Sequence, residues 1–69
     1  MKEAKPNHLL MSLRGERRRE TVAAAVGISV SALAAYEHGT RNPSDNVKRA
    51  LASYYGTTVG KLFFGEDTP

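Results

Sequence analysis

The side chains best suited to chemistry in this sequence are cationic, and they gather around one short stretch. Four arginines lie at or just before its start, and three more cations follow its end: Arg14, Arg17, Arg18, Arg19, Arg41, Lys48 and Arg49. Guanidinium groups bind the oxygens of phosphates through charge-assisted hydrogen bonds. The formal net charge is +3 and the sequence pI about 9.6. Both the charge and its placement therefore favour a polyanionic partner.

Catalytic and metal-binding constellations cannot be assembled from this sequence. Its two histidines, His8 and His38, are far apart, and there is no cysteine. Neither a nucleophile with an adjacent base nor a set of metal ligands can be built from them. No glycine-rich phosphate loop follows a strand, and no strand pattern is evident. We therefore expect no enzymatic activity, no metal and no cofactor.

Length and composition predict one small domain. The chain has 69 residues and no cysteine, so a single apolar core must hold it without disulfides. The absence of cysteine suits the cytoplasm. No apolar run has membrane-spanning length, and residues 1–6 lack the apolar segment of a signal peptide. We expect a cytoplasmic domain over 1–69 without a membrane partner, folded from about 7 to 64 between a solvated arm and a loose tail.

The stretch 19–38 is predicted to form two helices that meet at Gly27. One stripe of apolar residues at helical spacing runs through both: Val22, Ala23, Val26, Ile28, Leu33 and Tyr36. Gly27 can adopt the left-handed conformation that ends a helix, and Ser29 can cap the next one. The connection is short, so the helices must cross steeply, and the small Ala23 lets them approach. This is the helix-turn-helix pattern, whose second helix enters the major groove of DNA.

Three further helices are predicted around this motif. Asn7 is a plausible cap for a first helix over 8–15, and Ser44 or Asp45 for a fourth that reaches Tyr55. Thr58 caps a short fifth helix. Their apolar faces complete the core: Leu10, Leu13, Val47, Leu51, Ala52, Tyr55, Val59, Leu62 and Phe63. Tyr54 and Tyr55 fit this core better than a stacking platform for bases, and Phe64 is left over for the surface.

Residues 13–64 resemble the phage Cro/repressor-type helix-turn-helix family of small transcriptional regulators. The positions that carry the resemblance are small, apolar and turn residues at the family's spacings: Ala23, Gly27, the apolar residues 22, 26, 28, 33 and 36, then Glu37, His38, Gly39 and Pro43. The resemblance implies an all-α fold, a compact, lambda-repressor-like bundle of five helices. It also implies a prokaryotic or phage protein that binds an operator in double-stranded DNA.

The resemblance also implies roles for individual residues. Helix 30–38 becomes the recognition helix, and four of its residues face the bases: Val30, Ser31, Ala34 and Ala35. Ser29, the cap of this helix, is also expected to bind DNA. The turn that follows, with Thr40, Arg41 and Asn42, is well placed to touch backbone phosphates. Glu37 is expected to pair with Arg14 in a structural ion pair. Because the base-facing side chains are short, discrimination should depend on Arg19, on water and on DNA shape.

The start of the second helix departs from the family pattern. Ser or Thr followed by Gln is usual there, whereas this chain has Arg18 and Arg19 after a turn about two residues shorter. Arginine is a poor cap, and a cation at a helix N-terminus is unfavourable by roughly 0.3–1 kcal/mol. Such a local conflict often marks a functional position, here a phosphate site formed by arginine and free backbone N–H groups. A solvated run of charges is the alternative.

Two functions are compatible with these features. The first is a sequence-specific regulator of transcription, acting as a repressor by occupying an operator. One recognition helix reads few base pairs, so two copies on a pseudo-palindromic site are expected, with weak association in the free protein. The second is a protein-interaction module, such as an antitoxin that binds a partner protein and for which DNA binding is secondary. Phe64 and the tail support the second.

Overall fold

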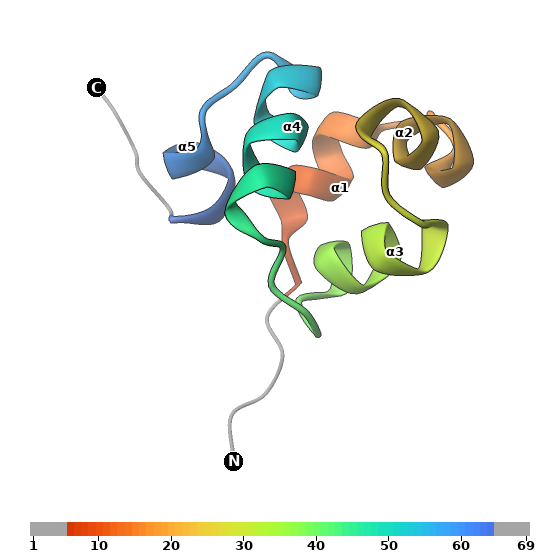
Figure 1. Cartoon of the computed structure of the whole chain (residues 1–69), viewed down its shortest axis with the longest axis horizontal. Helices are drawn as coiled ribbons and strands as arrows, with labels where there is room; N and C mark the ends of the chain where they lie inside the picture. The colour runs from red at the N-terminus through yellow and green to blue at the C-terminus, as the bar shows by residue number, and fades with distance from the viewer. Residues whose placement is uncertain (1–5, 65–69) are drawn as a thin grey trace.

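The computed structural model describes residues 6–64, and within this range every regular element is an α-helix (Figure 1). The helices, in chain order, are α1 (His8–Arg14), α2 (Arg19–Val26), α3 (Val30–His38), α4 (Asp45–Tyr55) and α5 (Val59–Phe63). The prediction of an all-α bundle of five helices is confirmed. The first helix ends one residue earlier than predicted, because Gly15 is its C-cap. The solvated arm was expected over residues 1–6 and the loose tail over residues 65–69. Pro6 is exposed, and residues 1–5 and 65–69 lie outside the described range.

Local hydrogen bonds set most of the helix ends. The side chains of Ser29, Ser44 and Thr58 each accept a bond from the backbone N–H three residues later. Gly27 adopts a left-handed conformation at the end of α2, with φ +85°, and its N–H donates to the carbonyl of Ala23. These are the caps expected from the sequence. Only the start of α2, at Arg18, lacks a capping side chain among these helices.

The core lies where α2 packs against both α3 and α4, while α1 packs on α3 and α5 on α4. Nine hydrophobic residues in the described range are buried: Leu10, Val22, Ala23, Ala32, Leu33, Tyr36, Leu51, Ala52 and Leu62. Removing their apolar surface from water is the main favourable term in folding. As a result, α3 is fixed to the bundle through one face and lies at the periphery of the molecule, on the side away from α5 (Figure 1).

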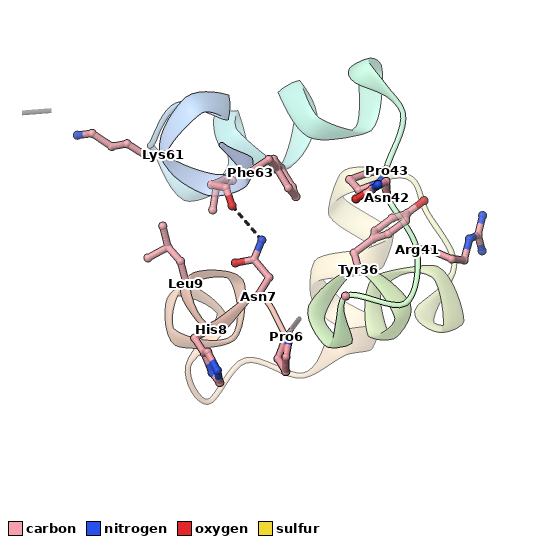
Figure 2. A pocket seen from close by; sticks show the side chains of 12 residues that line it. Pro6, Asn7, His8, Leu9, Tyr36, Arg41, Asn42, Pro43, Lys61 and Phe63 are labelled. Carbon is pink, nitrogen blue, oxygen red and sulfur yellow. Dashed lines mark hydrogen bonds between the residues drawn. The ribbon is translucent and has the colours of Figure 1, made fainter. Parts of the chain in front are cut away.

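Asn7 connects three helices, although the sequence indicated only a cap. Its Oδ1 accepts from the N–H of Leu10 at 3.0 Å, which caps α1. Its Nδ2 donates to the carbonyl of Leu62 in α5 at 2.9 Å, the bond drawn in Figure 2. Its backbone N–H donates to the carbonyl of Glu37 in α3 at 2.7 Å. One amide side chain and its peptide group therefore join the start of α1 to α3 and to α5.

Tyr54 and Tyr55 pack against the core, as expected, and form an edge-to-face pair with ring centroids 5.1 Å apart. The guanidinium of Arg17 lies over both rings, 5.6 Å from the Tyr54 centroid and 6.0 Å from that of Tyr55. The Tyr55 hydroxyl is buried, and no described residue forms a hydrogen bond with it. Burial, helped by the negative charge of Glu37, raises the pKa of Tyr55. Tyr54 and Tyr55 are therefore part of the packing around the core.

Candidate nucleic-acid interface

The outer face of α3 begins with two exposed side chains. Val30, 40 % exposed, and Ser31 occupy the first turn, after the Ser29 hydroxyl has accepted the Ala32 N–H at 3.0 Å. Ser29 is itself exposed, so its cap role leaves its O–H available as a donor. An apolar methyl-bearing side chain and a hydroxyl therefore stand together at the N-terminal end of this helix.

Further along α3, the residues expected to face bases are less accessible. Ala34 and Ala35 are half-buried, and the carbonyl of Ala35 accepts from the backbone N–H of Thr40 at 3.0 Å. Because their side chains are single methyl groups, a partner molecule can approach the backbone of α3 closely at these two residues. Val30 and Ser31 are therefore more accessible to a partner than Ala34 and Ala35.

Arg18 and Arg19, at the start of α2, differ in their surroundings. Arg18 is exposed, and its side chain forms no capping bond. Arg19 has a side chain that is 33 % exposed, and its Nε donates to Oε1 of Glu37 at 2.9 Å. That both arginines bind phosphate stays a prediction, and the difference between them is that the guanidinium of Arg19 is held on one side by a carboxylate.

Glu37 lies at the centre of a cluster of three charged side chains, which we call the Glu37 triad: Arg14, Arg19 and Glu37. Arg14 donates from Nε to Oε2 at 2.6 Å and from Nη2 to Oε1 at 3.2 Å. The Glu37 side chain is fully buried and that of Arg14 is 18 % exposed. The bond to Glu37 raises the pKa of Arg14 further above its already high value. Glu37 thus joins α1, α2 and α3.

The turn after α3 is anchored on its inner side and exposed on its outer side. Thr40 closes the helix through its hydroxyl, which donates to the carbonyl of Ala35 at 3.3 Å. Pro43 is buried, whereas Arg41 and Asn42 are exposed. The Arg41 guanidinium lies 5.7 Å from the centroid of the Tyr36 ring, an arrangement that restrains the side chain without consuming its hydrogen-bond donors.

An open hollow of about 550 Å³ lies behind this turn, between the start of α1 and α5. Tyr36, Pro43 and Phe63 give it apolar walls, and Asn7 lies across it (Figure 2). Figure 2 also shows the Arg41 side chain pointing away from the hollow, toward solvent. The turn therefore presents Arg41 outward while its inner residues pack inward.

Several of the cations that lie close together in the sequence form ion pairs or cation–π contacts within the protein. Arg14 and Arg19 bind Glu37, and Arg17 covers the tyrosine pair. The ammonium of Lys48 lies 4.7 Å from the ring centroid of Phe64. Helix periodicity could not show these pairings, since each joins different helices or a helix and a turn. Of the other cations named from the sequence, Arg18, Arg41 and Arg49 are exposed and form no ion pair within residues 6–64, and the Arg19 side chain also keeps one-third of its surface exposed.

Neither a metal site nor a membrane-spanning helix is found within residues 6–64. No group of three or more His, Cys, Asp or Glu side chains in this range could hold a metal ion. None of the helices in the same range is long and apolar enough to cross a membrane.

Comparison with known proteins adds to this geometry. A family model described as helix-turn-helix matches residues 11–62. The HTH-type transcriptional regulator DdrOP3 of Deinococcus deserti is 42 % identical over 66 residues, covering 86 % of this chain and 51 % of the relative. The chain thus spans about half the length of this curated relative. No solved structure matches significantly. The chain belongs to the Cro/repressor-type helix-turn-helix family.

Proposed function

We propose that this domain binds double-stranded DNA sequence-specifically and regulates transcription, with α3 in the major groove. The observation that carries the proposal is the arrangement of α3 and its flanks. Val30 and Ser31 are exposed on the helix, Arg41 is exposed in the turn that follows it, and Arg18 is exposed at the start of the preceding helix. A helix of this kind fits the major groove, and the two arginines are available for the phosphates.

Base readout in this proposal depends on small side chains. Val30 contacts a thymine methyl group, and Ser31 donates to or accepts from a base edge. The low surface at Ala34 and Ala35 brings the helix backbone close to the groove floor. Because none of these side chains forms a bidentate base contact, much of the discrimination comes from DNA shape and bridging water. Arg18, Arg19, Arg41, Thr40 and Asn42 supply phosphate contacts.

In this proposal the protein acts as a repressor by covering an operator. The name of the relative from Deinococcus deserti, a transcriptional regulator, supports regulation in general. We further propose that two copies bind a pseudo-palindromic site, with half-sites about one helical turn apart. One domain with short recognition residues reads too few base pairs by itself, and DNA holds the second copy beside the first.

Binding of a partner protein is the second candidate function, and the observation that favours it is Phe64. Its residue surface is 64 % exposed, the most among the exposed large hydrophobic residues of the described range. The ammonium of Lys48 lies near its ring. A single aromatic side chain is a small patch, so it fits an anchor in a limited contact better than a stable interface by itself.

Selection of duplexes from a random-sequence library separates the two functions. We expect the 69-residue protein to enrich a two-fold symmetric sequence and to bind it at least tenfold more tightly than random duplex at the same salt concentration, since specific sites usually gain about 10³-fold or more. Sedimentation of the protein with the enriched duplex should give two copies per duplex. Failure to enrich any sequence, together with capture of one protein that Phe64→Ala abolishes, would favour the second function.

A further inference from the structure

The Glu37 triad contains two positive charges and one negative charge. Arg14 alone occupies both carboxylate oxygens of Glu37, through bonds of 2.6 and 3.2 Å. Arg19 adds a third bond, from its Nε to Oε1, at 2.9 Å. The carboxylate is fully buried, so water does not compete for it. Arg14 is sufficient to compensate the charge of Glu37, and the second cation is in excess.

The bond from Arg19 uses only the part of its guanidinium nearest the backbone. Nε lies on the stem side of the group, so both terminal nitrogens keep their outward N–H donors. Among residues 6–64 no further hydrogen bond from Arg19 is formed, and its side chain is 33 % exposed. A second acceptor can therefore bind the outer edge while Glu37 keeps Nε.

We propose that Glu37 is a positioning residue for DNA binding, holding Arg19 so that its outer guanidinium edge meets a backbone phosphate. This inference rests on the proposed function. A free arginine side chain loses much rotamer freedom when it binds, whereas one fixed at Nε has lost part of it already. The excess positive charge of the triad is then neutralised by the phosphate. Glu37 thus links the protein core to the DNA backbone without touching DNA itself.

A double-mutant cycle on DNA affinity tests the proposal. The full chain is titrated with a fluorescent duplex that the wild-type protein has selected from a random library. Glu37→Gln is compared in the wild-type and Arg19→Ala backgrounds, and each affinity is corrected for the folded fraction from circular dichroism at the same temperature. Arg18→Ala is the matched control background, because Arg18 is an adjacent exposed arginine that does not contact Glu37.

We expect Glu37→Gln to weaken binding about fivefold to tenfold while Arg19 is present, as coupling within one charge network usually gives. In the Arg19→Ala background Glu37→Gln should weaken binding by less than about twofold. In the Arg18→Ala background it should weaken binding by the same factor as in the wild-type protein. Equal losses in all three backgrounds would mean that Glu37 is merely structural. Tighter binding by Glu37→Gln in the presence of Arg19 would mean that Glu37 withholds the arginine. Either result overturns the proposal.

Arg19→Lys decides the question if Glu37→Gln prevents folding. Lysine keeps the charge and leaves the bonds between Arg14 and Glu37 in place, but it has no Nε on its stem that Glu37 can hold. The DNA affinity of Arg19→Lys should fall most of the way toward that of Arg19→Ala. An affinity within about twofold of wild type would overturn the proposal, because charge alone would then be enough. If the wild-type protein binds no duplex at all, the proposed function fails, and this inference fails with it.

Discussion

Replacing Arg14 with alanine removes two of the three side-chain hydrogen bonds that described residues make to the buried carboxylate of Glu37. Only the single bond from Arg19 then remains. Breaking a buried ion pair by removing one partner usually costs about 3–5 kcal/mol, because the other charge stays buried. Arg19 still offsets part of that charge, and water can enter the space that Arg14 leaves at the surface. We therefore expect about 3 kcal/mol, the lower end of the range.

The expected loss is large compared with the stability of such a small domain. At about 0.05–0.15 kcal/mol per residue, a chain of 69 residues has an unfolding free energy of about 3–10 kcal/mol. With a urea m value of about 1 kcal/mol/M, a loss of 3 kcal/mol moves the unfolding midpoint by about 3 M. The titration is best followed by far-ultraviolet circular dichroism at about 15 °C, where such domains are most stable.

Two companion variants make the measurement specific to the pair. Arg19→Ala should cost no more than about 1 kcal/mol, because that side chain is one-third exposed and gives a single bond. The double change Arg14→Met with Glu37→Leu should cost less than the sum of the single changes, since no buried charge is left without a partner. A midpoint for Arg14→Ala that equals wild type, or a loss no larger than that of Arg19→Ala, would contradict a stabilising role for the pair of Arg14 and Glu37.

Three further predictions concern a hydrogen bond, an orphaned hydroxyl and the DNA contacts. Asn7→Asp keeps the cap oxygen of α1 but replaces the donor to Leu62, so it should destabilise by about 1–3 kcal/mol in thermal unfolding; an unchanged midpoint would show that this donor is dispensable. Tyr55→Phe should stabilise by about 1 kcal/mol, because the hydroxyl it removes has no partner among the described residues. Because the pKa of Tyr55 is raised in the folded protein, this tyrosine ionises at lower pH in the unfolded chain. Wild-type stability should therefore fall as pH rises through about 10, and the stability of Tyr55→Phe should fall less. A parallel decline of the two proteins would contradict the raised pKa of Tyr55. Arg18→Ala and Arg41→Ala should each weaken binding to selected and random duplexes alike and reduce the salt slope by about one, while Val30→Ala should change sequence preference with the slope unchanged; the reverse pattern would exchange their roles.

The helices and their ends could be predicted from the sequence because they are set by short-range physics. Ser29 caps α3 through a bond that spans three residues, and the left-handed Gly27 ends α2 through bonds to the turn before it. Apolar residues at helical spacing likewise identify the buried face of each helix. The partnership of Arg14 with Glu37 came from the resemblance, and the structure has the two side chains in contact.

Which polar groups meet across the bundle depends on how the helices pack, and the sequence does not show this. Nothing local distinguishes Arg19, which Glu37 holds, from Arg18 beside it, since the difference depends on how α2 crosses α3. The same holds for Arg17 over the tyrosine rings and for the bond from Asn7 to α5. A long side chain can contact any residue that packing brings within a few ångströms of it. The spacing of residues in the sequence does not identify that residue. The sequence therefore shows how many cations the chain has. The packing of the helices determines which of them are not bound within the protein and can contact DNA.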